Sequence, residues 1–232
     1  MTDKATYYLT SNAAGTAFTG TGYTPDGTIP AGAIPCTQEQ AQNFQAYVPS
    51  NGEIVSAPSA VLLAQAQTAQ KALVTKGYNT ATDYVPVTIN GTTYQVDNTP
   101  GKQALNLSLA ITANALMQAP AWAASTEYTA GAYCNVGGVI LFCSASGKSG
   151  ASAPTPPTTF GTPVTDGTAE WELMGRKVYL QGGSFVYMTP QQIMSAFQQG
   201  ELYLHQMSDQ LESLNAQINA ADLATVPTIN WP

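Results

Sequence analysis

Few side chains in this sequence are suited to acid–base, nucleophilic or metal chemistry. Charged residues make up 9% of the 232 residues, and His205 is the single histidine. Zinc sites need three or four ligands at short, regular spacings, and the cysteines Cys36, Cys134 and Cys143 form neither a CxxC nor, with His205, an HExxH pattern. Gly-rich phosphate loops and GxSxG nucleophile turns are also missing from the sequence. We therefore expect no metal, no cofactor and no catalytic residue.

One pair of carboxylates has a spacing that chemistry could use. Glu170 and Glu172 flank Trp171 in a predicted strand, so their side chains share one face about 7 Å apart. Some glycosidases place two carboxylates at such a distance. The simpler alternative is that both are exposed strand residues, and we predict that the protein is not an enzyme.

Aromatic residues are the remaining candidates for a binding site. Flat aromatic rings on a small β scaffold can contact the apolar faces of sugars, and the same rings can instead form the core of such a scaffold. The candidate carbohydrate-binding residues are Tyr128, Tyr133, Trp171 and Trp122.

These rings lie in a segment, residues 120–176, that differs in composition from its surroundings. Strands are predicted at residues 133–136, 139–144 and 169–174, and the run SASGKSGASAPTPPTTFGTP predicts irregular structure. A two-residue turn at Gly137-Gly138 would place Cys134 opposite Leu141, out of register with Cys143. We interpret the segment as a small inserted all-β module, and we favour free, buried thiols over a disulfide between Cys134 and Cys143.

Two similar units flank this module. Residues 85–89 and 92–96 alternate around Asn90-Gly91, a strong hairpin signal, and Thr99-Pro100 then predicts a helix to Met117. The second unit has strands at residues 177–180 and 184–188 around Gly182-Gly183, followed by a helix that Thr189-Pro190 begins and that runs to about residue 221. The pattern indicates an imperfect structural repeat.

The N-terminal part of the chain is less regular. A helix is predicted at residues 37–47 with Thr37 as its cap, and another at residues 58–76 that ends at Gly77. The predicted fold class is α+β: two β-hairpin-plus-helix units, a long C-terminal helix and the inserted module. The predicted domains are an N-terminal arm or cap (1–57), a helix with the first hairpin-helix unit (58–119), the β module (120–176) and the second unit with the long helix (177–232).

The long helix carries an apolar stripe that is typical of a coiled coil. Its members follow three- and four-residue steps over about three heptads. They are Phe197, Gly200, Leu204, Met207, Leu211, Leu214 and Ile218. The stripe predicts either packing on the chain's own helix at residues 100–117 or a homo-oligomer interface, for which we favour a trimer.

Charge and hydropathy restrict the partners. Seven basic and fourteen acidic residues give a net charge of −7, and no cluster of Lys and Arg is present to neutralise a row of phosphates. We therefore expect no nucleic-acid partner. The sequence has no stretch of about 18 apolar residues and its first residues lack a signal-peptide core, so we expect neither membrane insertion nor Sec export.

Residues 121–174 resemble the small chitin- and cellulose-binding modules of bacterial chitinases. The residues that carry this likeness are Trp122, Tyr128, Gly131, Gly138 and Phe142. The following proline-rich segment, then Thr-Asp-Gly-Thr and Trp171, is similar to a version of the module found in phage tail and virion proteins. Enzyme-borne modules carry an adjacent aromatic pair after the second strand, where this chain has Ser144-Ala145-Ser146.

Most of the chain outside this module resembles an uncharacterised domain of phage tail-fibre and fibre-assembly proteins. The likeness rests on the phrases VTINGTTYQVDNTPGKQALNLSLAI and VYLQGGSFVYMTPQQIMSAFQQGELYLHQ, and on Ile34-Pro35 leading into Thr37-Gln38-Glu39-Gln40. It implies a structural component of a tailed-phage particle, in the tail fibre, baseplate, collar or capsid exterior, that assembles in the host cytoplasm with other virion proteins. The module would then contact either the host surface, for example a surface glycan, or a neighbouring subunit. The alternative is a tail-fibre assembly chaperone, which would leave the finished particle.

Overall fold

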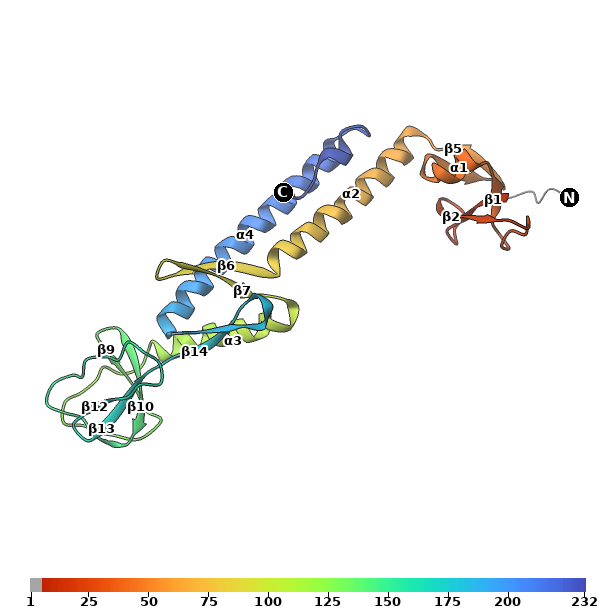
Figure 1. Cartoon of the computed structure of the whole chain (residues 1–232). Coiled ribbons are helices and arrows are strands. Elements are labelled where there is room, and N and C mark those ends of the chain that lie inside the picture. The colour runs from red at the N-terminus through yellow and green to blue at the C-terminus, as the bar shows by residue number, and fades with distance from the viewer. Residues whose placement is uncertain (1–5) are drawn as a thin grey trace. The chain divides into compact units, whose positions relative to one another are not determined.

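The computed structural model describes residues 6–232, which fold as an α+β protein (Figure 1). The predicted fold class is therefore confirmed. The described residues form two compact units, one of residues 6–74 with 214–232 and the other of residues 75–213. The α-helices are α1 (Gln38–Gln42), α2 (Ser59–Thr82), α3 (Pro100–Leu116) and α4 (Pro190–Ala220).

Short antiparallel strands open the first unit. They form a three-stranded sheet in the order β2 (Phe18–Thr24), β1 (Thr6–Ser11), β3 (Ile34–Cys36), and a hairpin of β4 (Tyr47–Ser50) and β5 (Glu53–Ser56). The side chain of Leu9 in β1 is fully buried.

The predicted helix at residues 37–47 is shorter in the structure. Thr37 caps α1 as expected: its hydroxyl accepts the backbone N–H of Gln40 at 3.1 Å, and the Gln40 side chain accepts the Thr37 N–H at 2.9 Å. The helix ends at Asn43, whose side-chain amide donates to the Glu39 carbonyl at 3.2 Å. A 3₁₀ turn, η1 (Phe44–Ala46), follows. Asn competes for backbone partners in this way, which explains the early end.

The first unit also contains the start of α2, the end of α4 and the C-terminal tail. Gln67 donates to the Ile218 carbonyl at 3.0 Å, and the buried Gln70 donates to the Ile229 carbonyl at 2.7 Å. The tail includes the 3₁₀ turn η3 (Val226–Thr228), and Val226 is buried. These bonds hold the tail along α2.

The prediction that the helix of residues 58–76 stops at Gly77 is wrong. α2 continues to Thr82, and the hydroxyls of Thr80 and Thr82 bond back to carbonyl oxygens one turn earlier. A glycine inside a helix costs about 1 kcal/mol relative to alanine. Contacts within the second unit offset this cost, including the hydrogen bond from the Tyr203 hydroxyl to the Ala81 carbonyl at 3.0 Å.

Both predicted hairpin-helix units are present, and their hairpins, α3 and most of α4 lie within residues 75–213. β6 (Tyr84–Ile89) and β7 (Thr92–Asp97) join through Asn90 and Gly91, both with positive φ, as the hairpin signal predicted. β14 (Arg176–Tyr179) and β15 (Phe185–Met188) are joined instead by a longer loop with a 3₁₀ turn, η2 (Gln181–Gly183). The first hairpin leads into α3 and the second into α4.

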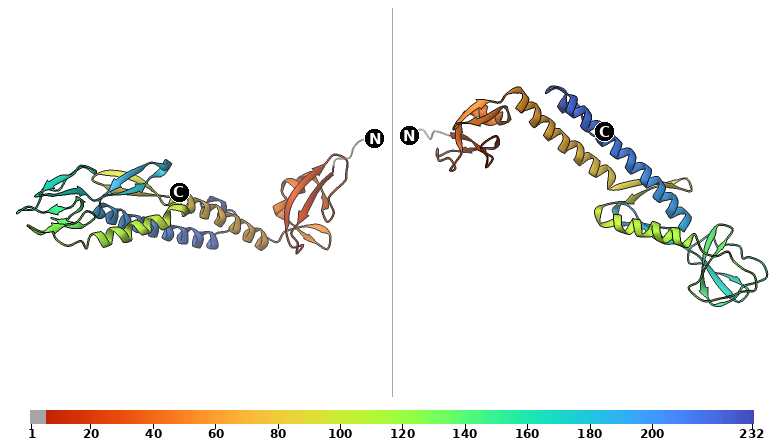
Figure 2. Two further views of the ribbon diagram at one scale, coloured as in Figure 1. Left: turned by 90° about the horizontal axis from the view of Figure 1, so that it is seen from below. Right: turned by 180° about the vertical axis from the view of Figure 1, so that it is seen from behind.

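The two hairpin-helix units share one hydrophobic core. Val96 of β7 bridges Leu180 after β14, and Figure 2 shows the strands of both hairpins along one side of α3 and α4. The buried core residues are Val85, Val87, Ile89, Val96, Ala113, Val178, Met188 and Ile193. A single body of two layers therefore carries the inserted module.

The module is a small antiparallel β structure with its own core. Its four-stranded sheet has the order β12 (Val164–Asp166), β13 (Ala169–Leu173), β10 (Val139–Ala145), β9 (Tyr133–Val136), and β8 (Glu127–Tyr128) pairs with β11 (Gly147–Lys148). The three predicted strands are confirmed, and Cys134 lies opposite Leu141 as predicted. Its core consists of Cys134, Leu141, Cys143, Ala169 and Trp171.

Candidate functional site

Two of the predicted sugar-binding residues belong to the interior of the module. The carboxylate of Asp166 is buried and accepts hydrogen bonds from the indole N–H of Trp122 at 2.7 Å and of Trp171 at 3.1 Å. Its other oxygen accepts the backbone N–H of Gly150 at 2.7 Å. Trp171 is fully buried, so the prediction that it contacts a sugar is wrong. Trp122 is half-buried, and its indole N–H is already hydrogen-bonded to Asp166.

Tyr128 is also tied into the module. Its ring meets Trp171 edge-on with 4.8 Å between ring centroids, and its hydroxyl accepts the Ala123 backbone N–H at 2.9 Å. The ring packs against the module core and is half-buried. The structure therefore gives Tyr128 mainly a packing role.

Tyr133 lies on the other face of the sheet, away from this core. It stands directly opposite Phe142, with ring centroids 5.7 Å apart and an interplanar angle of 48°. Phe142 in turn pairs with Glu172 on β13, so an aromatic pair and a carboxylate form one row across three strands. All three side chains are partly exposed. We call Tyr133, Phe142 and Glu172 the outer row.

The outer row has the chemistry of a sugar contact. Two neighbouring rings offer apolar faces, and the carboxylate can accept hydrogen bonds from hydroxyl groups. Phe142 is not among the sugar contacts predicted from the sequence. The signal was present, because the turn that pairs Cys134 with Leu141 also pairs Tyr133 with Phe142. Glu170 is exposed and pairs with Thr165, so the sheet face is open at that end, whereas Ile140 on the same face of β10 is buried.

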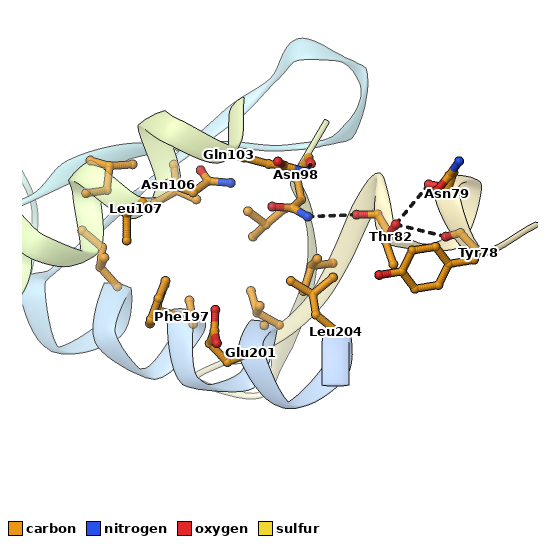
Figure 3. A pocket seen from close by; sticks show the side chains of 18 residues that line it. Tyr78, Asn79, Thr82, Asn98, Gln103, Asn106, Leu107, Phe197, Glu201 and Leu204 are labelled. Carbon is orange, nitrogen blue, oxygen red and sulfur yellow. Dashed lines mark hydrogen bonds between the residues drawn. The ribbon is translucent and has the colours of Figure 1, made fainter. Parts of the chain in front are cut away.

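A second feature is a pocket of about 500 Å³ in the main body (Figure 3). It lies between α3 and α4 over the valines of the hairpins, and Tyr78, Asn79 and Thr82 of α2 close one end. Its volume is within the range of ligand pockets, and its lining is largely apolar. Glu201 is the only charged residue of the lining, and its carboxylate points into the space. The pocket suits an apolar group better than an acid–base reaction.

The predicted oligomer stripe of α4 is divided between several environments. Phe197, Gly200 and Leu204 line the pocket, and Leu204 also packs against the shared core. Met207, Leu211 and Leu214 are half-buried. Ile218 is fully buried in the first unit, which contradicts its assignment to an oligomer interface. Contacts within one chain account for that residue, and self-association through the others stays a prediction.

The remaining reactive groups are isolated. The structure keeps all three cysteines as free thiols, as predicted. Burial, with smaller contributions from Asp166 and Cys143, raises the pKa of Cys134 to about 12, and burial also raises the pKa values of Cys143 and Cys36. His205 is exposed, and its Nδ1 lies 2.8 Å from the Glu201 carbonyl oxygen. Within residues 6–232, no group of three or more His, Cys, Asp or Glu side chains could hold a metal ion.

Comparison of the chain with protein-family models, with curated proteins and with solved structures found no match. In the part of the chain that the structure describes, no helix combines the length and the apolarity that crossing a membrane requires.

Proposed function

We propose that this protein is a non-catalytic structural subunit of a tailed-bacteriophage particle, and that its inserted module contacts a glycan on the host surface through the outer row. The position in the particle is the tail fibre, baseplate, collar or capsid exterior. The phage assignment rests on the sequence resemblances above. The observation that carries the adhesive role is the alignment of Tyr133, Phe142 and Glu172 on one accessible sheet face.

The reactive groups agree with a non-catalytic role. Thiols whose pKa values lie above the ordinary range stay protonated near neutral pH and are weak nucleophiles. The single histidine bonds to a backbone carbonyl on the surface of its own helix. A surface with few charges also suits repeated contact with neighbouring subunits.

Weak contacts suffice for this function because a particle carries many copies. One stacked ring contributes about 1 kcal/mol, and a pair of rings still gives a weak single site. Linking many such sites raises the overall avidity by orders of magnitude. The outer row therefore needs no deep pocket.

The test has two parts. Mass spectrometry of purified particles should find the chain at stoichiometric abundance, whereas absence from finished particles would favour the assembly chaperone. Beads that carry many copies of the full-length protein should bind chitin, cellulose or host envelope glycans. Tyr133→Ala and Phe142→Ala should each reduce this retention at least about fivefold, because each removes one ring from every site and the loss multiplies over linked sites.

The control variant is Tyr23→Ala, which removes an exposed tyrosine, 54% accessible, from the first unit. It should bind like the wild type. Retention that ignores both outer-row substitutions, or no retention on any of these glycans, would contradict the adhesive role and leave the module as a subunit-packing element.

A further inference from the structure

The outer face of the β14–β15 hairpin carries an accessible aromatic cluster outside the module's sheet. Lys177 stands opposite Tyr187, and Tyr179 stands opposite Phe185, so these four side chains share one face of the hairpin. The opposite face packs into the shared core through Val178 and its neighbours. Phe185 and Tyr187 remain 47% and 44% exposed. Core packing therefore does not account for these two rings.

Two rings of the cluster and the ring of Phe160 form a continuous series of ring contacts. Tyr187 lies between Phe160, with ring centroids 5.6 Å apart and planes at 36°, and Phe185, with centroids 5.7 Å apart and planes at 89°. Phe160 comes from the proline-rich segment of the module. A β-carbon at Gly175 would approach the Phe160 ring to 2.3 Å, so glycine at this position gives the ring its place. We call Phe160, Tyr187 and Phe185 the ring ladder.

Two lysines accompany the ring ladder. The Lys177 ammonium lies 4.3 Å from the ring centroid of Phe185 and 5.8 Å from that of Tyr187. The Lys102 ammonium lies 3.9 Å from the ring centroid of Tyr179. Within residues 6–232, neither ammonium forms an ion pair. Among the described residues these two lysines have no carboxylate partner, although the chain has a net charge of −7.

A small polar pocket borders the ring ladder. It has a volume of about 270 Å³, and Phe160 and Tyr187 form part of its wall. Its lining includes neutral amides and hydroxyls, among them those of Asn90, Thr92, Thr158, Thr189 and Gln192. This volume is slightly below the range of about 300–1,000 Å³ that is usual for ligand pockets, so the pocket suits one small unit of a longer polymer.

We propose that the ring ladder with Lys177 and the adjoining pocket binds an acidic polysaccharide, one sugar unit at a time. The rings contact the apolar faces of the sugars, the amides and hydroxyls bond to their hydroxyl groups, and the ammonium groups attract their carboxylates or sulfates. Two separate lysines do not form the row of cations that a nucleic-acid backbone requires. The proposal rests on the proposed function only in its choice of a glycan as the ligand. It concerns a different surface from the outer row.

Affinity electrophoresis of the full-length protein tests this site. Polygalacturonate in the gel should retard the wild-type protein, neutral dextran should retard it less, and added salt should weaken the effect because exposed charges are screened. Lys177→Gln and Tyr187→Ala should each lower the apparent affinity at least fivefold, whereas Tyr187→Phe keeps the ring and should bind like the wild type.

Matched variants show whether the retardation depends on this face of the hairpin. Lys148→Gln makes the same charge change on an exposed lysine of the module and should leave the retardation intact. Tyr133→Ala should also leave it intact, so the outer row and the ring ladder can fail independently. The thermal unfolding transition of each variant identifies any loss of folding. Because Lys177 is exposed, we expect Lys177→Gln to fold like the wild type.

The proposal is overturned if polygalacturonate does not retard the wild type, or if Lys177→Gln and Tyr187→Ala migrate like the wild type. It is also overturned if labelled oligothymidine binds more tightly than polygalacturonate and loses affinity in the same variants, because the face would then be a nucleic-acid site.

Discussion

Asp166 should hold the inserted module together, and its replacement by alanine is the most direct test of how the module is built. The side chain is 5% exposed and accepts three hydrogen bonds, from two indole N–H groups and from the Gly150 backbone. Asp166→Ala leaves all three donors without an acceptor. A buried donor without a partner costs ~1–3 kcal/mol. Because water can enter part of the space that the carboxylate leaves, we expect a total loss of about 3–5 kcal/mol in the free energy of unfolding.

Tryptophan fluorescence during urea unfolding measures this change in the module itself. The chain has three tryptophans, and Trp122 and Trp171 lie in the module, so Trp231→Phe in every protein restricts the signal to the module. Asp166→Asn should lose less, about 2 kcal/mol, because one amide oxygen remains as an acceptor while the amide nitrogen faces a donor. Glu170→Ala, an exposed carboxylate on the same sheet, should change the stability by less than about 0.5 kcal/mol.

The pKa of Cys134 provides a second test, of the electrostatic effect of Asp166. The charge of Asp166 contributes to the raised pKa of Cys134, although burial contributes more. Asp166→Asn should therefore lower the pKa of Cys134 while leaving it above its ordinary value. A loss below about 1 kcal/mol in Asp166→Ala would refute the central role of this carboxylate, as would equal losses in Asp166→Ala and Glu170→Ala.

Three further predictions concern packing, thiols and assembly. Gly147→Ala should destabilise the module by about 2 kcal/mol or more in urea unfolding, because its β-carbon would lie 2.2 Å from a backbone carbonyl oxygen, whereas Gly101→Ala, in open space on α3, should stabilise the protein by about 0.5–1 kcal/mol. The pKa of Cys134 is raised from 9.0 to about 12, so between these pH values the folded chain retains a proton that the unfolded chain releases. The free energy of unfolding should therefore fall as the pH rises through this interval, by up to ~1.4 kcal/mol per pH unit relative to Cys134→Ala. At pH 8, a thiol reagent should modify the half-buried Cys36 before the two buried thiols. Light scattering should find a trimer that Leu211→Asp disrupts, and a wild-type monomer that this substitution leaves unchanged would contradict self-association through α4.

Sequence alone determined the elements whose signals are local. Asn90-Gly91 predicted the first hairpin because few residues other than Asn and Gly accept positive φ at both turn positions. Thr189-Pro190 predicted the start of α4, where Thr189 caps the helix and Gln192 bonds back to its backbone N–H at 2.9 Å. The Gly137-Gly138 turn predicted the register of β9 and β10 because strand side chains alternate with a period of two. In each case the residues that fix the turn, the helix start or the strand register are neighbours in the sequence.

Tertiary structure decided what depends on residues far apart in the chain. Gly77 lies inside α2 because long-range contacts outweigh its low helix propensity. The residues next to Gly77 in the sequence do not indicate these contacts. Trp171 and Trp122 turn inward because one carboxylate, that of Asp166, binds both indoles, and pairs of residues 5 and 44 positions apart carry no mutual signal in the sequence. The outer row and the ring ladder likewise exist only after folding, when side chains from separate strands and from the proline-rich segment meet at one surface.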